Sequence, residues 1–216
     1  MGTIRLSRVK LRWHWANLAV RLGIVSVLLA VPVLLAPRIA AGQDLNQDKM
    51  AVVFYAEPKV EASVWPSLAD AFHAEILREE SEYPLPEDVA LIRGSSFSKG
   101  EEFAGVIEVR LIGRCDVVQQ AERVLPPGPL GWVVDVSGEI QPFVFVDCAR
   151  LAQFLNPTTL GMNDEQRKDA MARAISRVVI HEWIHIDGQT ARHTSRGLRK
   201  AELTGTELTG GSAGGR

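Results

Sequence analysis

The run His181-Glu182-Trp183-Ile184-His185 places three side chains that can do metal chemistry within five positions. On an α-helix, residues four apart lie on the same face, so His181 and His185 can offer two imidazoles to one ion. Glu182 then lies beside the open coordination position, where a carboxylate can accept a proton from water. The spacing predicts a helical metal site with a built-in general base.

A third ligand is needed, because zinc in catalytic sites usually takes three protein ligands and leaves the fourth position to water. His193 follows His185 by eight residues. Gly188 is expected to end the helix in a left-handed cap, which lets the chain turn back. Glu202 and Glu207 stay open as alternatives, because a later helix could return a carboxylate. The favoured ligands of one Zn²⁺ are His181, His185 and His193.

The expected chemistry is hydrolysis of a peptide bond. Zinc lowers the pKa of bound water from ~15.7 to about 7. Glu182 would take the proton as the water attacks a carbonyl carbon, and would then pass it to the leaving amine. The developing oxyanion needs one donor besides the metal. The candidate donors are Arg192, Arg196 and Tyr55. His73, in an apolar helical setting, is interpreted as a packed or surface histidine.

The first 41 residues are typical of a secretory signal. Five basic residues precede a largely apolar run over 22–36, and Ile39-Ala40-Ala41 supplies small residues for cleavage. Fifteen residues interrupted by Pro32 are short for a bilayer span of ~20. We therefore expect cleavage and an exported protein, periplasmic or secreted, and an N-terminal anchor in the inner membrane is the alternative. Only an uncleaved segment would contact the membrane.

The charge of the remaining chain argues against nucleic acid as a partner. Residues 1–41 hold six of the 24 basic residues and no acid, which leaves 18 basic against 26 acidic residues and a net charge of −8. About 175 residues remain, enough for one domain with its own core. The two cysteines, Cys115 and Cys148, could form a disulfide in an oxidising compartment, with two buried free thiols as the alternative.

Periodicity predicts an α+β fold, in which a small mixed twisted sheet packs against two helices. The first helix is expected over 66–82 and opens with Pro66. The second is the long active-site helix over 163–187, where Asn163 and Gln166 form a capping-box pattern. From Thr204 the Gly, Thr and Ser content predicts a flexible tail over 204–216. Strands are expected over 50–55, 89–92, 104–112, 132–136 and 140–146, with a short helix over 149–155.

The histidine motif resembles the HExxH zincin metallopeptidases. Gly188 stands where the metzincin group keeps its glycine, but the third metzincin histidine would fall on Ala191. No methionine follows Met171, so the metzincin Met-turn is also missing. The chain also resembles a group of small exported bacterial zincin-like proteins, many of them from acidobacteria and mostly uncharacterised. The matching positions are His181, Glu182, His185, Thr190, His193, Gly197, Lys200 and Ala201.

This resemblance, which covers residues 178–201, implies a zincin-like fold over 42–203 and a bound zinc ion. The leading hypothesis is a zinc metallopeptidase that acts on peptides or proteins outside the cytoplasm, with Glu182 as general base. The alternative is a non-catalytic protein of the same fold that binds a partner or assists assembly at the membrane surface. An intact Glu182 favours the first hypothesis, because a purely structural zinc site needs no general base.

Overall fold

The computed structural model describes residues 49–79, 83, 85–86, 88–98, 102–116 and 126–210. The signal or anchor expected over 1–41 lies outside these residues. The strands are β1 (Met50–Tyr55), β2 (Val89–Arg93), β3 (Gly105–Ile112), β4 (Gly131–Val136) and β5 (Glu139–Asp147). The α-helices are α1 (Pro58–Glu79), α2 (Cys148–Leu155), α3 (Asp164–Asp187) and α4 (Gly205–Leu208). Two 3₁₀ turns, η1 (Gly94–Ser96) and η2 (Gly197–Arg199), complete the described part.

The five strands form one mixed sheet in the order β2-β1-β3-β5-β4. Four of them run parallel, since β1 pairs in parallel with β2 and β3, and β3 pairs in parallel with β5. The edge strand β4 is antiparallel to β5. Parallel neighbours need a crossover connection, and α1 supplies it between β1 and β2. The predicted α+β class with a small mixed sheet is confirmed.

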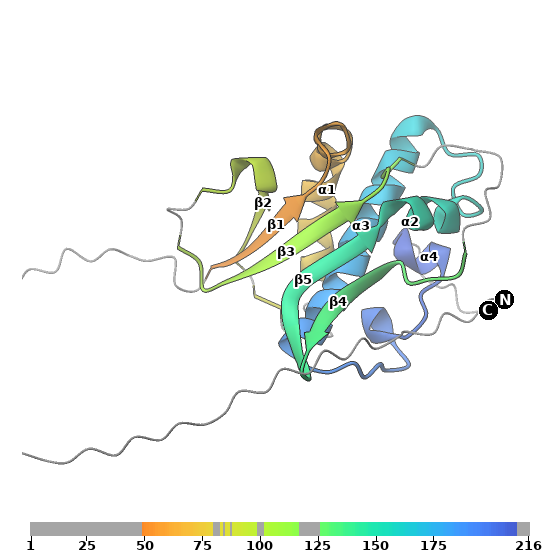
Figure 1. The fold of residues 1–216 in the computed structure, drawn as a ribbon. Coiled ribbons are helices and arrows are strands. Elements are labelled where there is room, and N and C mark those ends of the chain that lie inside the picture. The colour runs from red at the N-terminus through yellow and green to blue at the C-terminus, as the bar shows by residue number, and fades with distance from the viewer. Residues whose placement is uncertain are drawn as a thin grey trace, which may run out of the picture.

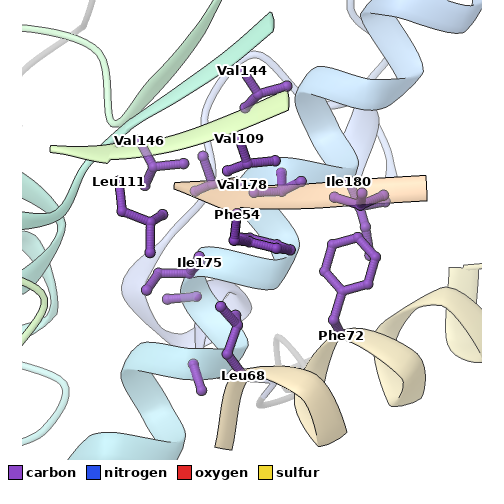
Figure 2. Close-up of a cluster of buried hydrophobic side chains, with 14 of the residues drawn as sticks. Phe54, Leu68, Phe72, Val109, Leu111, Val144, Val146, Ile175, Val178 and Ile180 are labelled. Atoms are coloured by element: carbon purple, nitrogen blue, oxygen red, sulfur yellow. The ribbon is translucent and has the colours of Figure 1, made fainter. Parts of the chain in front are cut away.

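Helices α1 and α3 lie side by side behind the sheet in the view of Figure 1. The core fills the space between the sheet and these helices, and Figure 2 shows side chains from both layers pointing into it. The ring of Phe54 on β1 meets the ring of Phe72 on α1 edge to face, with 5.8 Å between centroids. Val109, Val144 and Val146 face Ile175 and Val178 of α3 across the same core.

The first predicted helix begins earlier than expected. It starts at Pro58 and runs to Glu79, so Pro66 lies inside it. A proline in a helix interior removes one backbone hydrogen bond and costs about 3 kcal/mol. The helix continues because Val64 and Leu68, on either side of Pro66, are both buried in the core. Tertiary packing therefore outweighs the local preference that placed the start at Pro66.

Helix α3, which the sequence predicted as the active-site helix, begins where the sequence predicts. The side chain of Asn163 accepts a hydrogen bond from the Gln166 backbone N–H at 2.9 Å, and the Gln166 side chain accepts one from the Asn163 N–H at 2.9 Å. This reciprocal cap satisfies two backbone donors at the start of α3. In the described part of the chain, no helix has the length and apolar character needed to cross a membrane.

Thr204 does not begin a flexible tail, as the sequence predicted for 204–216; the last six of these positions, 211–216, lie outside the described residues. Thr204 and Glu207 form a second capping box, and the short helix α4 follows it. Leu208 at the end of α4 is fully buried against the core. The polar composition hid this helix, because four residues carry no periodic signal and the burial of Leu208 depends on tertiary contacts.

Cys115 and Cys148 form a disulfide that joins the segment after β3 to the first residue of α2. Both cysteines are buried. Asp147 directly precedes Cys148, and it caps α2 by accepting a hydrogen bond from the Arg150 N–H at 2.9 Å. The covalent link and the cap therefore fix the start of α2 beside the end of β3.

Candidate metal centre

The three histidines that the sequence predicts as metal ligands lie close together. Their ligand atoms all lie within 4.8 Å of one another. The Nε2 atom of His185 lies 3.1 Å from Nε2 of His181 and 3.2 Å from Nε2 of His193. Two imidazoles bound to one tetrahedral zinc ion at 2.0–2.1 Å would place their nitrogens about 3.3 Å apart. The observed spacing therefore fits three ligands of a single ion.

Helix α3 and the loop after it supply these ligands. His181 and His185 project from the last two turns of α3, one turn apart. Gly188 does not form the expected left-handed cap: its φ is −77°, and its N–H still donates to the Ile184 carbonyl at 3.0 Å. Gln189 takes the left-handed conformation instead, with φ of 44°. The chain reverses at Gln189, one residue late, and then brings His193 back to the helix.

Backbone carbonyls orient two of the three rings. Nδ1 of His185 lies 2.6 Å from the Thr190 carbonyl oxygen, and Nδ1 of His181 contacts the Leu198 carbonyl oxygen. A carbonyl can only accept, so each Nδ1 carries the proton and donates it. Each Nε2 is then left as the lone-pair nitrogen that a metal requires. The sequence motif alone did not identify Leu198 or Thr190 in this role.

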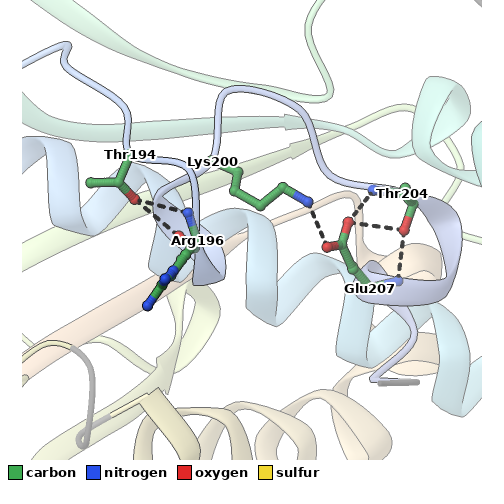
Figure 3. Close-up of polar contacts among 5 residues, drawn as sticks. All are labelled: Thr194, Arg196, Lys200, Thr204 and Glu207. Carbon is green, nitrogen blue, oxygen red and sulfur yellow. Dashed lines mark hydrogen bonds and ion pairs between the residues drawn. The ribbon is translucent and has the colours of Figure 1, made fainter. Parts of the chain in front are cut away.

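Leu198 lies in a tight turn that the chain builds next to the histidines. Gly197 has φ of 58°, a region that glycine adopts without strain. The turn is closed by a hydrogen bond from the Thr194 N–H to the Arg199 carbonyl at 2.8 Å, and the Thr194 hydroxyl also donates to the Arg196 carbonyl (Figure 3). The Leu198 side chain is fully buried. Its burial anchors the carbonyl that holds His181.

Burial keeps the cluster in the neutral form. The pKa of His181 is lowered to about 4, mainly by burial; the bond to Leu198 opposes this shift, and the nearby imidazoles of His185 and His193 add to it. Burial likewise lowers the pKa of His185 and of His193. Neutral imidazole is the metal-binding form, so at pH 7 protons compete little for these nitrogens.

Glu182 is a buried residue of α3, and its side chain lies against Gly131, the first residue of β4. Burial raises the pKa of its carboxyl to about 8. A Cβ atom placed on Gly131 would lie 3.4 Å from Oε1 of Glu182 and 2.4 Å from Cγ1 of Val178. The residue at this position must therefore be glycine for the edge strand to approach α3 this closely. No local pattern identified Gly131, because the contact joins segments about fifty residues apart.

The alternative ligands have other partners or lie at the surface. Oε1 of Glu207 accepts from Lys200 Nζ at 2.6 Å, while its Oε2 accepts from the Thr204 N–H and hydroxyl (Figure 3). Burial tends to raise the pKa of Glu207, but the bonds from Lys200 and Thr204 outweigh it and lower the pKa overall. Glu202 is exposed. Among the described residues, the cluster fit to hold a metal contains the three histidines alone.

None of the proposed oxyanion donors is placed at the cluster by a contact. Arg192 and Arg196 are exposed, as is His73 on α1. The Tyr55 ring packs against the backbone of Gly94 and under the guanidinium of Arg110. A cation that sequence reasoning missed does lie near the site.

That cation is Arg199, which directly follows the turn residue Leu198. Its guanidinium stacks over the ring of Tyr83 at 5.7 Å. Its positive charge contributes to the lowered pKa of His185, after the larger effect of burial. The Tyr83 hydroxyl in turn donates to Asp187, the last residue of α3. Arg199 therefore belongs to the layer that supports the histidines.

No family model matches the chain, and neither the curated proteins nor the solved structures contain a match to it. The functional assignment consequently rests on the site itself. Its residues combine three neutral imidazoles at zinc-compatible spacing, carbonyls that fix two of the rings, and one buried carboxylate. Such a donor set suits Zn²⁺, whose preferred ligands include imidazole nitrogen.

Proposed function

We propose that the protein is a zinc-dependent hydrolase of peptide bonds, with His181, His185 and His193 as ligands and Glu182 as general base. The observation that carries this proposal is the convergence of three Nε2 atoms beside a buried glutamate. A zinc ion bound there would supply Lewis acidity and bring the pKa of a water into the neutral range. The three ligands leave one coordination position for that chemistry.

Glu182 is suited to move the proton. A general base works best when its pKa lies near the working pH, and burial raises the pKa of the Glu182 carboxyl toward that range. The residue directly follows the first ligand, so its position is fixed by the same helical turn that fixes His181. A nearby divalent cation would favour the ionised carboxylate, which is the form that accepts a proton. Glu182 would therefore take the proton from the attacking water and return it to the leaving amine.

A peptide substrate is favoured by the edge strand beside Glu182. Among the described strands, β4 pairs with β5 alone, so its outer side has no strand neighbour. An extended peptide can add to such an edge through main-chain hydrogen bonds. Gly131, the first residue of β4, lies against Glu182. A peptide aligned on β4 would therefore pass close to the general base.

The mixed sheet with a metal-binding helix on one face also supports a zincin-like architecture, and the His181–His193 pattern supports the likeness to small exported bacterial zincin-like proteins. The disulfide between Cys115 and Cys148 supports a location in an oxidising compartment outside the cytoplasm.

The exposure of Arg192 and Arg196 favours the second candidate function, a non-catalytic binding or assembly protein, because catalysis needs an oxyanion donor beside the metal.

Replacing Glu182 with glutamine distinguishes the two functions. We expect Glu182→Gln to lower the cleavage of a fluorogenic peptide library by about 10²–10⁴-fold while zinc content stays at one ion per chain. The matched control is Glu202→Gln, which changes an exposed glutamate outside the cluster and should leave both measurements unchanged. Equal cleavage by wild type and Glu182→Gln would refute the catalytic role. Zinc binding without any cleavage by wild type would favour the binding protein.

A further inference from the structure

We propose that Gln189 is a positioning residue that sets the metal affinity of the histidine cluster by fixing the loop with His193 to the β4–β5 hairpin. This inference rests on the metal site of the proposed function. It assigns a role to a residue that neither coordinates nor touches the reacting atoms. The role follows from three hydrogen bonds of one side-chain amide.

The amide group of Gln189 is fully engaged with backbone atoms. Its Oε1 accepts from the Ile140 N–H at 2.8 Å, and its Nε2 donates to the Ile140 carbonyl at 2.9 Å. The same Nε2 donates to the Ile186 carbonyl near the end of α3 at 2.7 Å. Both donor hydrogens and the acceptor are thus used. One side chain therefore ties together the helix end, the loop and the second strand of the hairpin.

Ile140 lies in the first part of β5, which pairs with β4 but extends beyond its pairing with β3. β5 begins at Glu139, but its pairing with β3 begins only at Phe143. The Gln189 amide offers Ile140 one donor and one acceptor, as an adjacent strand would. The buried Ile140 side chain holds this part of β5 in place. The loop after α3 is therefore attached to the start of β5.

The backbone at Gln189 supports the same interpretation. Its φ of 44° lies in the left-handed region, which is unfavourable for residues other than glycine, asparagine and aspartate. Glycine would adopt this φ without strain but would lack the amide. The three hydrogen bonds of the amide offset the strain. They hold the chain reversal in a single geometry.

The segment that Gln189 fixes carries two elements of the metal site. The next residue, Thr190, provides the carbonyl that accepts from Nδ1 of His185 at 2.6 Å. The third ligand, His193, follows three residues later and reaches the Nε2 of His185 at 3.2 Å. Displacement of this segment would misorient one ligand and withdraw another. Groups that orient ligands in this way typically contribute 10–100-fold to metal affinity.

The test is a zinc titration of the full chain against a chromophoric chelator of known affinity. Gln189→Gly removes the amide and relieves the backbone strain, whereas Gln189→Glu keeps an acceptor and removes both donors. We expect both variants to bind zinc about 10–100-fold more weakly than wild type. The matched control is Gln141→Ala on the same hairpin, whose side chain donates only to the Glu139 carbonyl at 3.3 Å. That control should bind like wild type.

A second readout separates positioning from general stability. Cobalt in place of zinc gives a visible absorption band whose intensity reports tetrahedral geometry, and we expect Gln189→Gly and Gln189→Glu to weaken it at saturating metal. Circular dichroism of the metal-free variants identifies a temperature at which they are folded, and the titrations are made there. Wild-type zinc affinity and an unchanged cobalt band in both Gln189 variants would overturn the inference alone. A wild type that binds no zinc would overturn the proposed function as well.

Discussion

Nη1 of Arg177 donates to Oε2 of Glu75 at 2.5 Å, and this ion pair joins α3 to α1 in the interior. The two side chains are 7% and 5% exposed. A second guanidinium, from Arg78, lies 3.0 Å from the same carboxylate oxygen. Arg177 precedes His181 by one helical turn. The pair therefore fixes the register of α3 against α1 immediately before the two turns that carry His181 and His185.

Removing the acid of this pair should destabilise the fold strongly. Glu75→Ala leaves the Arg177 guanidinium buried without this carboxylate, and we expect the free energy of unfolding in guanidinium chloride to fall by about 3–5 kcal/mol. The double variant Glu75→Leu with Arg177→Met should recover most of this loss, because an apolar pair needs no desolvated charge. The control Glu202→Ala changes an exposed glutamate and should have little effect. A double variant as unstable as Glu75→Ala would contradict this explanation.

His193 can be tested against a histidine outside the cluster. His193→Ala removes one of the three proposed ligands, and we expect zinc affinity to fall by at least about 10²-fold, since two imidazoles rarely hold the ion alone. His73→Ala removes an exposed histidine on α1 and should leave the affinity unchanged. Metal content after dialysis and competition titration measure both. If His193→Ala retained wild-type affinity, Glu207 or Glu202 would have to be reconsidered as the third ligand.

Local signals in the sequence account for what could be predicted. The capping box at Asn163 and Gln166 marks the start of α3, and the spacing of His181 and His185 places both on its last two turns. The same spacing cannot show what supports the rings. Leu198 contacts His181 through its carbonyl, an atom that every residue has, so no side-chain pattern could identify it.

The remaining differences arise from contacts between distant segments. Gln189 meets Ile140 across 49 positions, and Gln189 rather than the expected Gly188 takes the left-handed conformation. Leu208 is buried although the residues around it are glycine or polar, so α4 could not be distinguished from a tail. Local preference is a weak guide wherever tertiary packing decides the conformation.

Glu182 makes the stability of the metal-free protein depend on pH in a defined direction. Its folded pKa of about 8 lies above its usual value of 4.5. A carboxyl with a raised folded pKa favours folding fully below about pH 4.5 and loses that contribution as the pH rises toward 8. His181 acts in the opposite range: its folded pKa of about 4 lies below 6.5, so its contribution is lost as the pH falls from 6.5 to 4.

Comparing wild type with Glu182→Gln isolates the contribution of Glu182 to the pH dependence, because His181 titrates in both proteins. Glutamine carries no charge, so we expect the metal-free variant to be more stable than wild type by up to about 3 kcal/mol at pH 7. The difference should shrink toward zero near pH 4, where Glu182 is protonated in both the folded and the unfolded state. Urea unfolding in the presence of a chelator, repeated between pH 4 and pH 8, measures it. A difference that stays constant over this range would show that Glu182 is not a buried carboxyl with a raised pKa, and would remove the electrostatic basis for its role as a base.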